Sequence, residues 1–121
     1  MTQILLVDDD EDFRESLKEV LENRGFAVTG ATDGNEGRRH LESQGYDLVI
    51  SDVLMPENDG VELLVLVRSK WPGTRFLAIS AGGRLGPEEC LEMCDRLGAD
   101  GTLEKPFSAQ EITAMIGKLL G

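Results

Sequence analysis

The feature that most constrains the fold is a regular alternation of short apolar runs with longer amphipathic stretches. Most of the short runs are continuously apolar, which is typical of parallel strands that are covered on both faces. They predict five strands, at Ile4–Val7, Phe26–Val28, Asp47–Ile50, Phe76–Ile79 and Thr102–Leu103. The second and the fifth runs are the weakest, so we expect these two strands at the edges of a sheet.

Helical spacing of apolar residues follows each of these runs, and glycines at Gly25 and Gly98 serve as stop signals. The predicted helices cover Phe13–Leu21, Asn35–Ser43, Val61–Val67, Pro87–Leu97 and Ser108–Leu119. The last of them opens with a capping box, Ser108-Ala-Gln-Glu111. A strand–helix alternation with right-handed crossovers predicts a doubly wound α/β fold, and 121 residues are most simply one domain.

The charge balance and the cysteines limit the possible partners and location. Twelve basic residues against 23 acidic ones give a net charge of −11. Such a surface repels nucleic acid and anionic membranes, so we expect no direct binding to either. The first apolar run is too short for a signal peptide or a membrane span. Cys90 and Cys94 are expected to be packing or surface thiols, with a redox or metal role as the alternative, and a reducing cytoplasmic location fits.

Polar residues directly follow the predicted strands, where ligands bind in open parallel sheets. Asp8 and Asp9 follow the first strand, Asp52 the third, Ser80 the fourth and Lys105 the fifth. Two carboxylates about 4 Å apart repel by roughly 4 kcal/mol at an effective dielectric constant of about 20, so without a cation one of them would have to take up a proton. Carboxylate oxygens suit Mg²⁺, which also binds phosphate oxygens. The edge of the sheet therefore predicts a magnesium and phosphoryl site, with Lys105 neutralising one phosphoryl oxygen.

The acids that continue the run after Asp9 need no ligand to explain them. Asp10, Glu11 and Asp12 precede the first predicted helix, where negative charge is favoured by the helix dipole. We therefore assign these three residues to the solvated start of a helix.

These residues and their order resemble the receiver domains of two-component response regulators, in the CheY-like superfamily. The resemblance runs from Gln3 to about Leu120. Its motifs are Val7-Asp8-Asp9, Asp52-Val-Leu-Met-Pro56 with Asp59-Gly60, Ser80-Ala81, Gly98-Ala99 and Lys105-Pro106-Phe107. It implies a flavodoxin-like (βα)5 three-layer sandwich, in which the parallel sheet has the strand order 2-1-3-4-5.

The resemblance also implies a role for each site residue. Asp52 would be the phosphoacceptor, and Asp9, Asp52 and the backbone carbonyl of Leu54 would ligate Mg²⁺ directly. Asp8 would act mostly through a metal-bound water. Ser80 would donate a hydrogen bond to the phosphoryl group and Lys105 would pair with it. The peptide bond before Pro106 would be cis.

The implied function is a switch that takes a phosphoryl group from a histidine kinase or a phosphotransfer protein. The domain would then control an output domain or partner protein, and it could form a homodimer when phosphorylated. We expect the kinase to dock on the first helix, at Phe13, Arg14, Leu17 and Lys18. The domain would catalyse only its own phosphorylation and a slow dephosphorylation, because Leu54 and Gly82 cannot orient a water molecule. Thr102 occupies the position of the usual aromatic switch residue, so the signal must leave by another route or be weaker.

Two other classes of function compete with this interpretation. A metal-dependent phosphatase with an aspartate nucleophile would normally carry a second acid two residues later, where this chain has Leu54. A pseudo-receiver that binds partners without phosphorylation would be expected to lack an acid, the acceptor or the lysine, and here all are present.

Overall fold

The computed structural model describes residues 1–53, 59–80 and 92–121. Its strands are β1 (Gln3–Val7), β2 (Ala27–Ala31), β3 (Leu48–Asp52), β4 (Arg75–Ser80) and β5 (Gly101–Glu104). Its helices are α1 (Glu11–Asn23), α2 (Gly34–Ser43), α3 (Asp59–Lys70) and α5 (Ala109–Leu120). Residues 92–96 are also helical, where the end of the predicted fourth helix was expected. The predicted start of that helix at Pro87 lies outside the described residues.

The strands form one parallel sheet in the order β2-β1-β3-β4-β5, which confirms the predicted order and the two predicted edge strands. β2 is longer than predicted, because Thr29, Gly30 and Ala31 continue the pairing with β1 up to Val7. Thr29 and Gly30 interrupt the apolar pattern of the sequence there. The backbone hydrogen bonds between β2 and β1 do not depend on side chains, so the strand continues.

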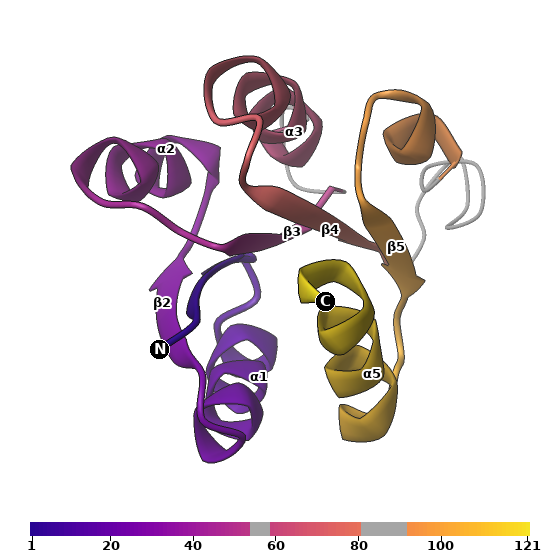
Figure 1. Cartoon of the computed structure of the whole chain (residues 1–121). Coiled ribbons are helices and arrows are strands. Elements are labelled where there is room, and N and C mark those ends of the chain that lie inside the picture. The colour runs from indigo at the N-terminus through magenta and orange to yellow at the C-terminus, as the bar shows by residue number, and fades with distance from the viewer. Residues whose placement is uncertain (54–58, 81–91) are drawn as a thin grey trace.

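Helices cover both faces of the sheet, so the molecule has three layers (Figure 1). α1 and α5 lie on one face, while α2, α3 and the helical residues 92–96 lie on the other. The sheet contributes alternate residues to two separate cores: Ile4 and Leu6 join the core under α1 and α5, and Leu5 and Val7 join the opposite one. Burial on both faces explains why the strand sequences are continuously apolar. Among the described residues, no helix combines the length and the apolar character needed to cross a membrane.

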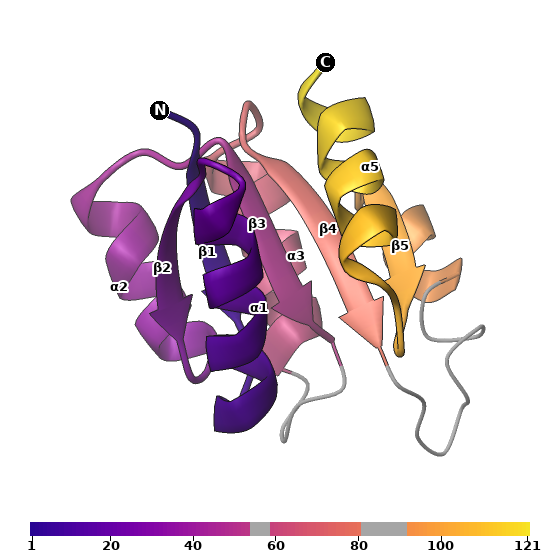
Figure 2. The ribbon, with the colours of Figure 1, turned by 90° about the horizontal axis from the view of Figure 1, so that it is seen from below.

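The carboxyl ends of the strands meet at one end of the sheet, toward which all the arrows point in Figure 2. The register fixes this edge: Val7 pairs with Ser51, Asp52 with Ile79, and Ser80 with Glu104. The residues that follow β1 and β5 and the last residue of β3 are therefore brought to the same place by backbone pairing alone.

Candidate functional site

Three carboxylates gather at this edge of the sheet. Asp8 and Asp9 follow β1 and Asp52 ends β3, and each offers one carboxylate oxygen such that all three oxygens lie within 4.8 Å of one another. Asp8 is fully buried and Asp52 is 7% exposed, whereas Asp9 is exposed. The predicted acidic cluster is therefore present, with two members in the protein interior and one open to solvent.

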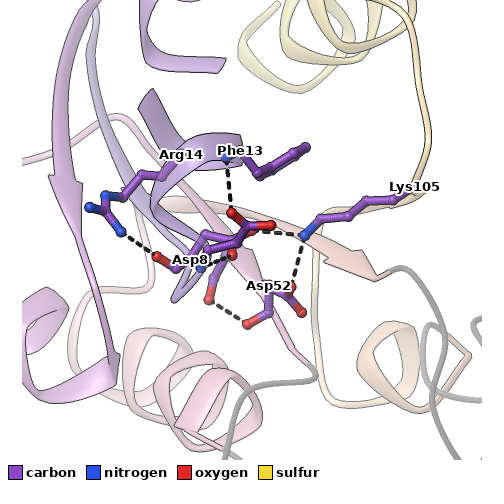
Figure 3. A network of polar contacts seen from close by, with 7 residues as sticks. Asp8, Phe13, Arg14, Asp52 and Lys105 are labelled. Atoms are coloured by element: carbon purple, nitrogen blue, oxygen red, sulfur yellow. Dashed lines mark hydrogen bonds and ion pairs between the residues drawn. The ribbon is translucent and has the colours of Figure 1, made fainter. Parts of the chain in front are cut away.

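Lys105 joins the cluster from beyond β5 (Figure 3). Its Nζ lies 2.9 Å from Asp8 Oδ2 and 2.9 Å from Asp52 Oδ2, and it makes a hydrogen bond and an ion pair with each. The backbone N–H of Lys105 donates to the carbonyl oxygen of Ser80 over 2.8 Å. The peptide bond between Lys105 and Pro106 is cis, as the resemblance implied. Four residues from three separate parts of the chain thus form a single charged pocket.

Burial and charge pairing act in opposite directions on these groups. Burial raises the pKa of Asp8 above its usual value, and the hydrogen bonds from Lys105 and from the backbone of Asp10 offset only part of this effect. Burial would lower the pKa of Lys105, but its hydrogen bonds to Asp8 and Asp52 outweigh burial, so this pKa is raised. Lys105 therefore remains a cation, while the ionised form of Asp8 is costly to maintain.

The side chain of Arg14 holds the backbone of Asp8 in place through a hydrogen bond. Its Nη1 donates to the Asp8 carbonyl oxygen over 2.8 Å, and the residue is buried (Figure 3). Gly30 in β2 leaves the space for this side chain, since a Cβ at Gly30 would lie 3.3 Å from Arg14 Cδ. Burial and this hydrogen bond give Arg14 a structural role, while the docking of a kinase on the first helix stays a prediction. The helical spacing of Arg14 with the buried Leu17 and Leu21 was the signal that it faces inward.

The start of α1 is tied to the same pocket. The Asp10 N–H donates to Asp8 Oδ1 over 2.9 Å, and Asp10 is the N-cap, whose Oδ1 accepts from the Phe13 N–H over 3.1 Å. Glu11 and Asp12 are exposed in the first helical turn. The assignment of Asp10, Glu11 and Asp12 to a helix N-terminus is confirmed.

Gly60 sets the distance between α3 and the end of β3. A Cβ at this position would overlap the carbonyl oxygen of Asp52 and would lie 2.5 Å from Val53 Cα. The glycine of the Asp59-Gly60 motif is thus required because the start of α3 lies very close to the backbone at the end of β3, beside Asp52.

The remaining predicted site residues are only partly defined. Ser80 is buried at the end of β4, and its carbonyl oxygen contacts the Lys105 backbone, while the role of its hydroxyl stays a prediction. Leu54, Gly82 and Cys90 lie outside the described residues. Cys94 is fully buried in the core beside α3, which agrees with a packing role. Thr102 is half-buried in β5 and pairs with Ala78.

The donor chemistry of the pocket fits a divalent cation. Asp8, Asp9 and Asp52 supply hard carboxylate oxygens, of the kind that Mg²⁺ takes one or two at a time with water and phosphate completing its shell. Exposure of Asp9 leaves the cluster open to solvent on one side, as such a partly hydrated ion requires.

Comparison with known proteins decides the family. Residues 4–117 match the response regulator receiver domain. The chain belongs to this family. The receiver domain is 38% identical over 120 residues to the transcriptional regulatory protein CpxR of Escherichia coli, covering 99% of this chain and 50% of CpxR. It is 34% identical over 120 residues to a probable chemotaxis protein CheY of Rhizobium etli, covering 98% of this chain and 92% of that protein.

Solved structures give the same result for the receiver domain. A receiver domain protein from Clostridium thermocellum superposes with a TM-score of 0.90 at 26% identity, covering 99% of this chain and 94% of that one. The response regulator TrrA from Thermotoga maritima, solved in complex with Mg²⁺ and BeF, gives a TM-score of 0.86 at 31% identity, covering 99% and 100%. The chain spans about half the length of the CpxR proteins that it matches.

Proposed function

We propose that residues 1–121 act as one receiver domain that accepts a phosphoryl group on Asp52. One observation supports this most directly: the Lys105 ammonium lies 2.9 Å from the carboxylates of both Asp8 and Asp52. A half-buried lysine that bridges two acids provides a positive charge beside the nucleophile, where a transferred phosphoryl group would bring new negative charge.

The proposed Mg²⁺ ligands are Asp9 and Asp52, with the backbone carbonyl of Leu54, and Asp8 acts through a bound water. When bound, the ion neutralises negative charge on the phosphoryl oxygens. Asp8, Asp9 and Asp52 each place one carboxylate oxygen within 4.8 Å of the others. Arg14 and the N–H of Asp10 fix Asp8 in place, so the ligand set needs little reorganisation.

The chain's own residues perform the transfer by position and charge. A carboxylate oxygen of Asp52 bonds to phosphorus as the phosphorus–nitrogen bond of the donor's phosphohistidine breaks. The electron pair stays on the imidazole nitrogen, which takes a proton from water. Lys105 then pairs with a phosphoryl oxygen, and the Ser80 hydroxyl donates a hydrogen bond to another.

A histidine kinase or a phosphotransfer protein is the proposed donor. An apolar groove between α1 and α5 is lined by Phe13, Leu17, Phe107 and Ile112 among others, and it adjoins the pocket because Phe13 also contacts Lys105. We assign the docking of the donor to this groove. An output domain or partner protein, a homodimer after phosphorylation and a cytoplasmic location stay predictions from the sequence.

The two alternative functions are less well supported. A pseudo-receiver would lack part of the set of three acids and one lysine, which this pocket contains. A phosphatase would need a second acid where the sequence has Leu54. We propose that the domain is not an enzyme acting on other substrates, and that it loses its own phosphoryl group slowly.

The test is phosphorylation by a small donor. The purified chain is incubated with Mg²⁺ and acetyl phosphate, and its intact mass is measured. We expect the mass of one added phosphoryl group in the wild type and none in Asp52→Asn. Asp12→Asn, which removes an exposed acid from the first turn of α1, serves as the matched control and should be phosphorylated normally. Equal phosphorylation of Asp52→Asn, or continuous release of phosphate with no phosphoprotein, would contradict the proposal.

A further inference from the structure

An aromatic ring closes the acidic pocket on the side of α1. The Lys105 Nζ lies 4.0 Å from the centroid of the Phe13 ring, within the range of a cation–π interaction. In Figure 3 the Phe13 side chain points from the first turn of α1 toward the end of Lys105. The ammonium group thus has two carboxylates and one aromatic ring as its neighbours.

The ring is held in place from two directions. The backbone N–H of Phe13 is bound by the Asp10 side chain, which fixes the first turn of the helix. The Phe107 ring packs edge-on against Phe13, with the centroids 5.9 Å apart and the planes at 83°. Phe107 is only two residues beyond Lys105, so the same segment supplies both the cation and the ring that orients Phe13.

We propose that Phe13 is a positioning residue for Lys105 and that its ring face holds the ammonium beside Asp52 during phosphorylation. This inference rests on the proposed function. A lysine side chain has a long flexible stem, and its three hydrogen-bond donors can turn toward solvent when the charges around it change. A phosphoryl group on Asp52 changes those charges, because it adds acceptors to one of the two acids that Lys105 contacts.

An aromatic face suits this task better than another acid or an aliphatic side chain. It attracts the cation but accepts no proton and adds no negative charge that would repel an incoming phosphoryl group. An aliphatic side chain of similar size would fill the space without attracting the ammonium. The interaction therefore favours one place for the cation both before and after transfer.

A series of fluorinated phenylalanines at position 13 tests this inference without changing the shape of the side chain. One, two and three fluorine atoms progressively remove electron density from the ring face, so the attraction for the cation weakens in steps. We expect the rate of phosphorylation by acetyl phosphate at saturating Mg²⁺ to fall stepwise, by about two- to fivefold in total. Phe13→Leu should be slowed to a similar degree, and Phe13→Tyr should restore a rate within about twofold of the wild type.

A spectroscopic readout separates positioning from general packing. In the wild type the ring current of Phe13 should shift the ε-methylene protons of Lys105 upfield, and Phe13→Leu should abolish this shift. Phe26→Leu is the matched control, because Phe26 is also a half-buried phenylalanine packed against the same core but precedes β2 at the other end of the sheet. It should leave both the rate and the lysine signal unchanged.

Failure of this inference is distinguishable from failure of the proposed function. Fluorinated proteins that are phosphorylated as fast as the wild type would overturn the role of Phe13 and leave the role of Asp52 intact. A wild type that takes up no phosphoryl group on Asp52 would overturn both. A loss of rate in Phe26→Leu equal to that in Phe13→Leu would also contradict a specific role for Phe13.

Discussion

At the scale of single residues, the pocket balances three carboxylates against one ammonium. The negative charge of Asp8 is the least compensated of the three, because Asp8 is fully buried and shares the Lys105 ammonium with Asp52. The pKa of Asp8 is raised, mainly by burial, which means that keeping this carboxylate ionised in the folded protein costs free energy. A site that binds a cation and a phosphoryl group has to keep such a charge ready, so part of the folding free energy is given up for function.

Asp8→Asn should therefore stabilise the protein in metal-free buffer. The amide oxygen of asparagine can still accept the Asp10 N–H, and Lys105 keeps its ion pair with Asp52. We expect the free energy of unfolding at about pH 7 to rise by about 1–2 kcal/mol, measured by urea denaturation. Glu19→Gln, which removes one exposed acid from the middle of α1, is the control and should change it by less than about 0.5 kcal/mol.

The difference in the free energy of unfolding between Asp8→Asn and the wild type depends on pH, because Asp8 binds a proton with different affinity in the folded and unfolded states. Because the pKa of Asp8 is higher in the folded protein than its usual 3.8, the folded state binds the proton more tightly. The free-energy cost of ionising Asp8 in the folded protein is absent below pH 3.8, and it develops as the pH rises from 3.8 through the folded-state pKa. The stability advantage of Asp8→Asn should therefore shrink as the pH is lowered toward about 4. An advantage that grows on acidification would contradict this assignment.

At the scale of elements, the pocket is positioned by how closely helices approach the strand ends. α1 begins directly after Asp10 and carries Arg14 and Phe13 to the pocket. α3 begins with Asp59 and Gly60, where the helix lies against the backbone of Asp52. These approaches fix the carboxylates through backbone contacts, and they tolerate little added volume.

A pair of glycine substitutions tests the approach of α3. Gly60→Ala should lower the free energy of unfolding by about 1–3 kcal/mol, because the new Cβ would overlap the Asp52 carbonyl oxygen. Gly117→Ala, in the interior of α5 with nothing within 4 Å of an added Cβ, should raise it by about 0.5–1 kcal/mol. Thermal or urea unfolding of both variants decides the matter, and a neutral Gly60→Ala would mean that α3 can move away at no cost.

The sequence reveals the elements and the charged pocket because each leaves a local signal. Runs such as Leu48–Ile50 are apolar because both faces of the strand are buried, and Asp52 stands out as an acid two residues after such a run. The hydrogen bond from Arg14 to the Asp8 carbonyl oxygen and the contact of the Phe13 ring with Lys105 depend on tertiary packing, so the amphipathic pattern of the helix does not reveal them. The end of β2 depends on its partner strand in the same way.

At the scale of the whole molecule, a domain with a net charge of −11 places two buried acids, Asp8 and Asp52, at one end of its sheet. The surrounding negative charge favours the arrival of a cation and disfavours nucleic acid. The chain spans about half the length of the CpxR proteins, and control of an output domain or partner protein stays a prediction from the sequence.

Magnesium should stabilise the folded chain through this pocket. At a free Mg²⁺ concentration of about 100 times Kd, we expect a gain of about 2.7 kcal/mol in the free energy of unfolding. The gain should be reversed by a chelator and strongly reduced in Asp9→Asn, because the exposed Asp9 is one of the proposed ligands. An equal gain in Asp9→Asn would place the metal elsewhere.

The most direct test of the account is to locate the phosphoryl group chemically. After phosphorylation, borohydride reduction converts an aspartyl phosphate into homoserine, which tandem mass spectrometry assigns to one position of the chain. We expect homoserine at position 52 alone, in a protein whose Asp8, Asp9 and Lys105 are intact. Homoserine at position 8 or 9, or its complete absence from a protein that has gained the mass of a phosphoryl group, would contradict it.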